Sequence, residues 1–374
     1  MVDINASEDC LHNTTTLMKR LQLLEKVSET EFLREKHIKF SLRVLGVLPI
    51  RYKFLDSTRL VMAFFAISTL DLLDALDQIE SEREKLIEWI YALQVVPTGN
   101  ETEKIDFGFR GSFTCIAGDD VNSDFCDKAN LAMTYTALST LVILGDDLSR
   151  VCRKDILSSL HDLQLSDGSF RPMNLECEND MRYVYCASCI CYILQDWSHI
   201  DVQKTVQYIK KSRNYDGGIG QGPGLESHGG STFCAVASLY LMGELEKAFS
   251  LTEMNALRRW LVFRQNQGFQ GRPNKPEDTC YTFWIGAILK ILDSYEFVNV
   301  PEVLKFVLST QDSIVGGMSK WIDDSPDMLH TYLSISGILL FNKNLPPLVH
   351  PALNISERAA HSLSHIHKQW MLQS

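Results

Sequence analysis

The sequence predicts an all-α protein in which alternating outer and inner helices form a closed α/α barrel. Two observations support this prediction. Strand-like alternation is scarce, and turn signals separate apolar segments of helical length. Glycine-rich turns also recur at intervals of roughly 50–60 residues, a period typical of repeat architectures. These turns lie at residues 107–111, 167–170, 216–219, 267–271 and 315–318.

The first part of the chain predicts a polar arm and three amphipathic helices. We expect residues 1–28 to form the arm, which has a weak helical pattern, and residues 29–374 to form a single domain. The three helices are expected at residues 31–48, 57–76 and 82–96. Pro49 and Pro97 end the first and the third, because proline cannot continue a helix.

Each repeat of about 50 residues pairs two helices of different character. The first is amphipathic, as at residues 156–165 and 202–212, and the second is apolar nearly all round, which is typical of a buried helix. Such pairs build either an open solenoid or a closed barrel. We expect closure around an aromatic-lined hollow, because the inner helices are rich in small residues that let backbones pack closely. The inner helices are expected at residues 131–144, 181–194, 231–241, 282–292 and 329–340.

The composition excludes several classes of protein. The 374 residues are 45% hydrophobic, which is enough for one large core. No run of 18 apolar residues occurs, so we expect no transmembrane helix. The polar, acidic N-terminus does not resemble a secretion signal, and we expect a cytoplasmic protein whose ten cysteines are reduced. A net charge of −11 argues against nucleic-acid binding.

Residue types that bind metals occur where two inner helices begin. Pro276 suits the first position of a helix, which places Asp278 and Cys280 in a first turn whose dipole favours the thiolate. The two residues lie about 200° apart on a regular helix, so they share a metal only if that turn is irregular. The starts of all inner helices meet on one rim of a barrel, and His330 is then placed as a third ligand. Three ligands with an open fourth position are typical of catalytic zinc.

Basic side chains and a phenol are expected on the same rim. They are Arg182, His228, Arg272, Lys275 and Tyr281. Together with several helix N-termini they would form an anion site, because donors, positive charge and dipoles point the same way. Each residue alone also has an ordinary interpretation, such as a capping histidine or a solvated basic turn. Because they recur at the starts of successive inner helices, the interpretation we favour is a metal site next to an anion pocket, with an apolar cavity adjoining both.

Several stretches resemble the β subunits of protein prenyltransferases. The motifs are Gly271-Arg-Pro-Asn-Lys-Pro-Glu-Asp-Thr-Cys-Tyr-Thr-Phe-Trp284, Gly224-Leu-Glu-Ser-His-Gly-Gly-Ser-Thr-Phe-Cys234, Asn179-Asp-Met-Arg-Tyr-Val-Tyr and Asp327-Met-Leu-His-Thr-Tyr332. Residues 179–182, 272–276, 132–136 and 141–150 are most similar to the type I geranylgeranyl enzymes of that family. The resemblance covers about residues 30–370 and is specific, because several long motifs occur in order.

The resemblance implies an α/α-barrel β subunit that forms a heterodimer with a helical-repeat α subunit. It implies transfer of a geranylgeranyl group from its diphosphate to the cysteine of C-terminal CaaX sequences, often ending in Leu, on Rho-like small GTPases and similar proteins. It implies one zinc ion held by Asp278, Cys280 and His330. The diphosphate-binding residues implied are Arg182, His228, Arg272, Lys275, Tyr281 and Lys320.

The resemblance also bears on selectivity. Lys320 falls where the farnesyl enzymes have a magnesium-binding carboxylate, so we expect no requirement for magnesium. Val61 falls where those enzymes carry a bulky tryptophan, which leaves room for a longer lipid, and Phe65 is expected to line the same cavity. Asn130 and Ala132 fall near the C-terminal end of the peptide. Type I relatives generally have a more polar small residue at position 61 and a histidine at position 130.

Four alternatives remain at this point. A farnesyltransferase β subunit is disfavoured by Lys320 and Val61, and a Rab-type geranylgeranyltransferase β subunit would need an escort protein. A non-catalytic helical scaffold with a structural zinc is disfavoured by the open fourth position and the basic rim. A terpene cyclase on a similar barrel would carry an aspartate-rich motif, which is not evident in this sequence.

Overall fold

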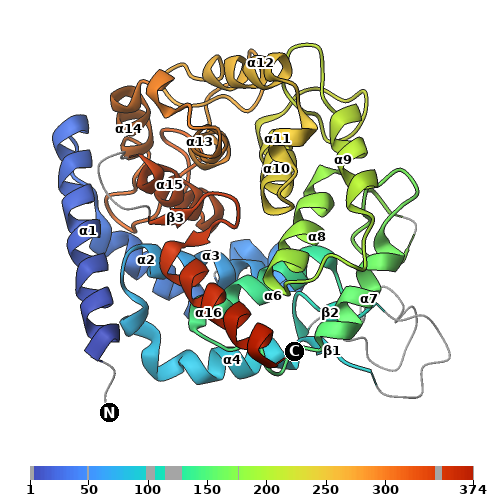
Figure 1. Cartoon of the computed structure of the whole chain (residues 1–374). Helices are drawn as coiled ribbons and strands as arrows, with labels where there is room; N and C mark the ends of the chain where they lie inside the picture. The colour runs from blue at the N-terminus through green and yellow to red at the C-terminus, as the bar shows by residue number, and fades with distance from the viewer. Residues whose placement is uncertain are drawn as a thin grey trace.

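Six inner helices stand side by side in a closed ring (Figure 1). Each contacts the next one along the chain, and the last of them contacts the first. The prediction of a closed barrel, rather than an open solenoid, is therefore confirmed. The inner helices are α3 (Arg59–Leu72), α6 (Leu131–Leu144), α8 (Met181–Ile193), α10 (Gly229–Leu241), α13 (Tyr281–Ile291) and α15 (Met328–Leu340). The computed structural model describes residues 4–48, 50–97, 106–113, 129–175, 177–341 and 348–373.

A second set of helices lies outside this ring (Figure 1). These outer helices are α2 (Arg34–Gly46), α4 (Arg83–Ala92), α7 (Arg153–Leu163), α9 (Val202–Lys211), α12 (Leu251–Val262) and α14 (Val300–Leu308). Helix α9 shows why they take this place: Thr205, Val206 and Ile209 are buried, whereas its lysines face solvent. One apolar face is enough to cover the inner ring, and the opposite face stays hydrated.

Short elements connect the helices. They are the 3-10 helices η1 (Ile50–Thr58), η2 (Leu76–Glu82) and η4 (Tyr295–Phe297) and the short helix α11 (Leu245–Ala248). Strand β1 (Gln94–Val95) pairs antiparallel with β2 (Gly108–Phe109), and β3 (Val349–His350) pairs antiparallel with β4 (Ile355–Ser356). Gln94 lies opposite Phe109, and Val349 lies opposite Ser356. Sheet is thus a minor part of the described chain, as expected of an all-α protein.

The glycine-rich turns connect successive outer helices around the ring. Four of them carry an isolated β-bridge at an equivalent place, namely Gln164 with Phe170, Arg213 with Ile219, Gln265 with Phe269 and Gln311 with Met318. Each turn packs on the next outer helix. A Cβ atom at Gly217 would lie 2.5 Å from the Ala256 carbonyl oxygen on α12, and one at Gly316 would lie 2.1 Å from the Lys36 carbonyl oxygen on α2. The last turn therefore packs on the first outer helix, which closes the circle.

An aromatic belt lines the ring, with one side chain from each inner helix. Its members are Phe64, Tyr135, Tyr185, Phe233, Phe283 and Tyr332. Successive ring centroids lie 5.2–6.2 Å apart, from Tyr332 through Phe64 and onward to Phe283. Aromatic pairs at such separations stabilise beyond their buried area. The belt therefore ties all six inner helices together at one level.

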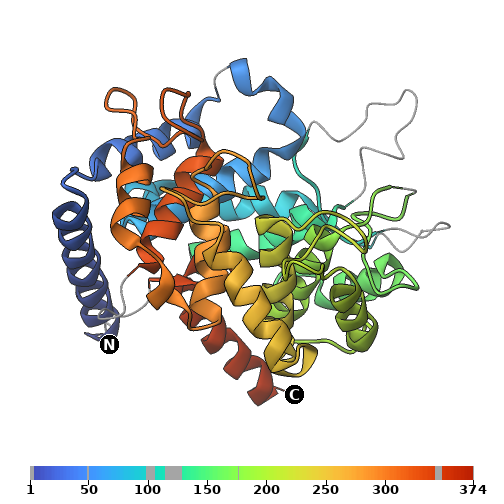
Figure 2. The same ribbon diagram turned by 90° about the horizontal axis from the view of Figure 1, so that it is seen from above.

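The chain near the C-terminus closes one end of the barrel. The hydroxyl of Tyr135 donates to the Leu353 carbonyl at 3.2 Å and that of Tyr185 to the Ala352 carbonyl at 3.0 Å. The hydroxyl of Tyr332 donates to the Asn354 carbonyl. Helix α16 (Glu357–Gln373) follows this segment and crosses the closed end, while the glycine-rich turns lie at the opposite end (Figure 2). Access to the interior is therefore from the end where the inner helices begin.

The predicted arm contains a long helix, α1 (Ile4–Ser28), that packs beside α14. Leu17, Leu21 and Leu24 on α1 are buried in the main hydrophobic core. The side chain of Arg20 is also buried, and it donates to the Leu339 carbonyl at the end of α15. A domain boundary after residue 28 stays a prediction. Among the described residues, no helix combines the length and the apolar character needed to span a membrane.

Candidate functional site

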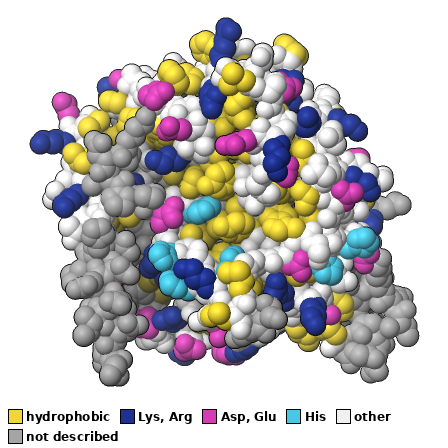
Figure 3. Space-filling view, viewed as in Figure 1, with side chains coloured by type: hydrophobic (Ala, Val, Ile, Leu, Met, Phe, Trp, Pro, Cys, Tyr) yellow, Lys and Arg dark blue, Asp and Glu magenta, His cyan; other side chains and the backbone are white. Residues whose placement is uncertain are grey.

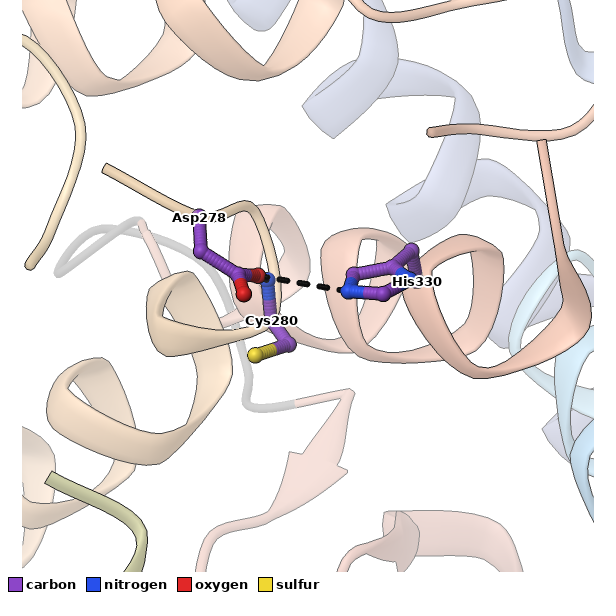
Figure 4. Close-up of side chains that lie close together, drawn as sticks. All are labelled: Asp278, Cys280 and His330. Atoms are coloured by element: carbon purple, nitrogen blue, oxygen red, sulfur yellow. Dashed lines mark hydrogen bonds and ion pairs between the residues drawn. The ribbon is translucent and has the colours of Figure 1, made fainter. Parts of the chain in front are cut away.

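Three residues that offer metal ligands come together where α13 and α15 begin (Figure 4). Asp278 and Cys280 lie on the turn that precedes α13, and His330 lies in the first turn of α15. Each offers one ligand atom, and these atoms all lie within 4.8 Å of one another. A carboxylate, a thiol and an imidazole at such separations fit a zinc ion with a position left for a further ligand.

The turn that carries Asp278 and Cys280 is not helical. The prediction that Pro276 opens the helix is wrong, since α13 begins at Tyr281. Glu277 forms a β-bridge with Gln270, and the Asp278 N–H donates to the Phe269 carbonyl at 3.1 Å. These bonds hold Glu277 and Asp278 out of the helix, whereas Cys280 already has helical backbone angles. The two ligands can therefore face one point, which a regular helix would prevent.

Asp327 fixes the orientation of His330. It is the N-cap of α15, and its carboxylate accepts from the His330 N–H at 3.0 Å. The same carboxylate lies 2.6 Å from His330 Nδ1, while Nε2 lies 3.3 Å from Asp278 Oδ1. Ser325 and Pro326 do not begin this helix, because Asp327 is bridged to Met318. Carboxylates that orient a ligating histidine in this way are a regular part of metal sites.

The three ligands depend on one another electrostatically. Burial opposes the charged form of His330, but hydrogen bonds to Asp278 and Asp327 outweigh it and raise its pKa to about 9. Burial also works against the Asp278 carboxylate, yet bonds from His330 and Cys280 hold its pKa below the usual range. Burial and the charge of Asp278 raise the pKa of Cys280, contrary to the expectation that the helix field favours its thiolate. A bound cation would reverse this order, because it stabilises carboxylate and thiolate together.

Lys320 brings a positive charge next to the three ligands. Its Nζ lies 3.8 Å from Asp278 Oδ2 and 4.4 Å from the centre of the Trp321 ring. The backbone around it is held by Thr279, whose N–H donates to the Lys320 carbonyl at 3.1 Å. The ammonium group thus lies beside the metal ligands, at the end of the barrel where the inner helices begin.

A second cluster lies beside the start of α10. His228 caps that helix, and its Nε2 lies 3.0 Å from the hydroxyl oxygen of Tyr281. Burial and the nearby charges of Arg272 and Arg182 lower the pKa of His228, so both arginines act on this ring. The Gly229 N–H donates to the Gly271 carbonyl at 2.8 Å and holds the two helix starts together.

Both arginines are oriented by acidic partners. Arg182 donates from Nε and Nη2 to the carboxylate of Asp180, which also caps α8. Arg272 donates to Glu226 at 2.9 Å. Lys275 differs, because its side chain is exposed and makes no hydrogen bond or ion pair with any described residue. Its part in an anion site stays a prediction.

Hydrophobic side chains gather in the middle of the face that carries α16, and most charged ones lie around its edge (Figure 3). On otherwise buried inner helices, Val61, Phe65, Ala132, Tyr183 and Trp284 remain half-buried. These five side chains are therefore not fully packed by their neighbours.

Three of the predicted pocket residues, Val61, Phe65 and Ala132, are among these half-buried side chains. Val61 and Phe65 lie one turn apart on α3, and the Phe65 ring is 5.6 Å from that of Tyr332. Asn130 caps α6 by accepting from the Ala132 N–H at 2.9 Å, so its carbonyl oxygen is already engaged. Contact of these residues with lipid or peptide stays a prediction.

Sequence reasoning missed four residues that shape the site. Asp327 and Asp180 act through His330 and Arg182, while Tyr183 and Trp284 remain half-buried on inner helices. An aspartate three residues before a histidine at a helix start is a capping signal, and it could have identified Asp327. The two aromatic residues gave no such signal, because apolar residues fill these helices on every side.

Comparisons with known proteins agree with this arrangement. Residues 32–356 match the prenyltransferase alpha-alpha toroid domain family. The geranylgeranyl transferase type-1 subunit beta of Arabidopsis thaliana is 38% identical over 342 residues, 88% of this chain and 90% of that protein. The subunit of the same name from Dictyostelium discoideum is 38% identical over 338 residues, 87% of this chain and 96% of that protein. The structure of Candida albicans protein geranylgeranyltransferase-I complexed with GGPP aligns with a TM-score of 0.79 and 27% identity, over 90% of this chain and 99% of that one.

Proposed function

The chain belongs to the prenyltransferase family with the alpha-alpha toroid fold, and from this premise we propose that it is the catalytic β subunit of a type I protein geranylgeranyltransferase. It transfers the geranylgeranyl group of geranylgeranyl diphosphate to the cysteine of C-terminal CaaX sequences, often ending in Leu, on Rho-like small GTPases and similar proteins. It does so in the cytoplasm, as a heterodimer with a helical-repeat α subunit. The observation that carries this proposal is the Asp278, Cys280 and His330 cluster beside a cationic rim at the open end of an apolar barrel.

The metal site is assigned to one zinc ion. Asp278, Cys280 and His330 would hold it, and their three donor types suit zinc better than magnesium, which prefers oxygen ligands. When bound, zinc would lower the pKa of the substrate thiol, so that a thiolate is present near neutral pH. Asp327 keeps the His330 ring turned toward Asp278.

The cationic rim stabilises the leaving group. As the bond between the first lipid carbon and oxygen breaks, negative charge develops on the diphosphate. Arg182, Arg272 and Lys320 supply positive charge there, and Tyr281 supplies a hydroxyl donor. Donors that are already in place when charge develops lower the barrier without reorganisation. Lys320 stands beside Asp278, and we propose that its charge makes magnesium unnecessary.

The hollow of the barrel takes the lipid. Phe65, Tyr183 and Trp284 offer apolar and aromatic surface along the inner wall. Each buried methylene stabilises the bound lipid by about 0.8 kcal/mol, so a 20-carbon chain gains much of its affinity there. The closed floor at residues 352–354 keeps water out from the far end.

A transfer assay on the heterodimer tests the proposal. The chain is co-expressed with an α subunit and given geranylgeranyl diphosphate with a peptide ending in a CaaX sequence whose last residue is Leu. Mass spectrometry should find the peptide heavier by one geranylgeranyl group, and the same peptide with serine in place of cysteine should stay unmodified. Transfer that occurs only when an escort protein is added would support the Rab-type enzyme instead. Absence of product from a heterodimer that binds zinc would support the inert scaffold.

A further inference from the structure

Two histidines stand one turn apart on α16, at the closed end of the barrel. His361 and His365 are both exposed, and their rings stack with centroids 5.0 Å apart and planes 24° from parallel. Neither ring makes a hydrogen bond or ion pair with any described residue. Of the ten histidines in the chain, only these two stand three or four positions apart. Their ring nitrogens are therefore close together and available to a ligand.

The helix holds this pair in place. Ala359, Leu363 and Ile366 lie on the opposite face of α16 and are buried in the main hydrophobic core. His367 on the same helix differs from the pair, because it is half-buried and its Nε2 lies 3.0 Å from the Ile193 carbonyl oxygen. The backbone beneath the pair is thus fixed before any ligand arrives, and binding requires only the rotation of two exposed side chains.

The spacing of the pair suits a single metal ion. Side chains four residues apart on a helix lie next to each other, and histidine pairs at this spacing hold the metal in zinc-binding helices. Imidazole nitrogen is a good ligand for zinc, whereas magnesium and calcium prefer oxygen. Because both rings are exposed, water can complete the coordination of the ion. The donor atoms therefore select zinc over the common oxygen-binding cations.

Charged neighbours determine how tightly the pair can bind a cation. The carboxylate of Glu357, one turn before the pair, interacts electrostatically with His361 and favours a cation there. Lys368, one turn after the pair, is exposed and acts against it. Arg358 is also close in sequence, but its guanidinium is paired with the carboxylate of Asp71. With two protein ligands and charges of both signs, we expect weaker binding than at the three-ligand site.

We propose that His361 and His365 bind a zinc ion at a second, outer site, at the opposite end of the barrel from Asp278. An ion held by both rings links two successive turns of α16 and stabilises this helix. Helix α16 follows residues 352–354, whose carbonyls accept hydrogen bonds from three inner helices. Zinc at this site therefore stabilises the closed end, as any ligand of the folded state does. The inference does not depend on the function proposed above.

A zinc titration of the untagged heterodimer tests the site. Zinc is added in competition with a calibrated chromophoric chelator, and the zinc bound beyond that already present in the purified protein is counted. We expect one further, weaker equivalent in the wild type. His361→Asn and His365→Asn should each weaken it roughly tenfold or more, because one imidazole holds zinc much less well than a chelating pair. His161→Asn is the matched control and should change nothing, since His161 is exposed on α7 with no histidine, cysteine or acidic residue three or four positions away.

Other outcomes would overturn the inference. If the wild type takes up no further zinc, or if the wild type and both variants bind it equally well, the pair is not the site. Zinc should also raise the unfolding temperature of the wild type more than that of either variant, and equal increases would refute the link to α16. Both variants should transfer lipid at the wild-type rate, because the pair lies at the other end of the barrel from Asp278. A wild-type heterodimer that transfers no lipid overturns the proposed function alone.

Discussion

Replacing Asp327 with asparagine tests whether this helix cap also sets the affinity of the metal site. The carboxylate of Asp327 makes two bonds, one to the His330 N–H at 3.0 Å and one to Nδ1 at 2.6 Å. Asparagine caps helices as well as aspartate, so the first bond is retained. The second loses its charged acceptor, and loss of such an oriented partner typically lowers metal affinity 10–100-fold. We expect Asp327→Asn to bind zinc roughly tenfold more weakly, at nearly unchanged thermal stability.

Competition with a calibrated chelator measures this affinity, and thermal unfolding of the metal-free protein measures the cap. Ser250→Ala is the matched control, because Ser250 caps the outer helix α12 in a capping box far along the chain from the metal ligands. It should cost about 1 kcal/mol of stability and leave zinc affinity unchanged. Wild-type zinc affinity in Asp327→Asn would refute the reasoning that the carboxylate orients His330.

Three further predictions concern closure of the ring, its packing and its charge. His37 on α2 is buried and accepts from the Gly317 N–H at 3.0 Å, and burial lowers its pKa to about 4 despite its bond to Gln311. The free energy of unfolding should therefore be highest above pH 6.5, the pKa of the unfolded state, and should fall as the pH drops from 6.5 toward 4. His37→Asn should reduce this pH dependence, as measured by urea unfolding. The same pH dependence in the wild type and the variant would contradict the assignment. A Cβ atom at Gly337 would lie 2.7 Å from the Thr282 backbone, so Gly337→Ala should lower the free energy of unfolding by about 1–3 kcal/mol. Gly46→Ala is the control and should be nearly neutral, because a Cβ atom there meets nothing within 4 Å. Equal unfolding midpoints for the two variants would contradict close packing of α13 and α15. Lys320→Ala should slow lipid transfer about a hundredfold, whereas Lys305→Ala, at an exposed site, should not slow it. A strong dependence of wild-type turnover on added magnesium would contradict the role given to Lys320.

The helices of the inner ring could be predicted from the sequence because they are apolar on every side. The expected span 131–144 is the span of α6, and that of α8 differs by one residue at its end. A helix that is apolar on every side is buried whichever neighbours pack against it, so the local sequence pattern is sufficient to predict it. The order of the ring followed from the period of the glycine-rich turns, since each turn packs on the next outer helix.

The form of the segments that lead into α13 and α15 could not be predicted in this way. Pro276 and Ser325 are good local signals for a helix start, yet β-bridges from Glu277 to Gln270 and from Asp327 to Met318 hold both segments extended. Backbone pairing with the glycine-rich turn just before each segment replaced the local preference. The sequence predicted that Asp278 and Cys280 need an irregular turn, but the pattern of side chains does not reveal the backbone pairing that causes it.

The assignment to the type I enzymes is tested most directly by offering the heterodimer equal amounts of geranylgeranyl and farnesyl diphosphate with one CaaX peptide ending in Leu. We predict that mass spectrometry finds mainly the 20-carbon product, and that Val61→Trp moves the ratio toward the 15-carbon product by narrowing the space for lipid beside Phe65. Mainly 15-carbon product from the wild type would contradict it: the metal site and the rim would stand, but the chain would be a farnesyltransferase subunit.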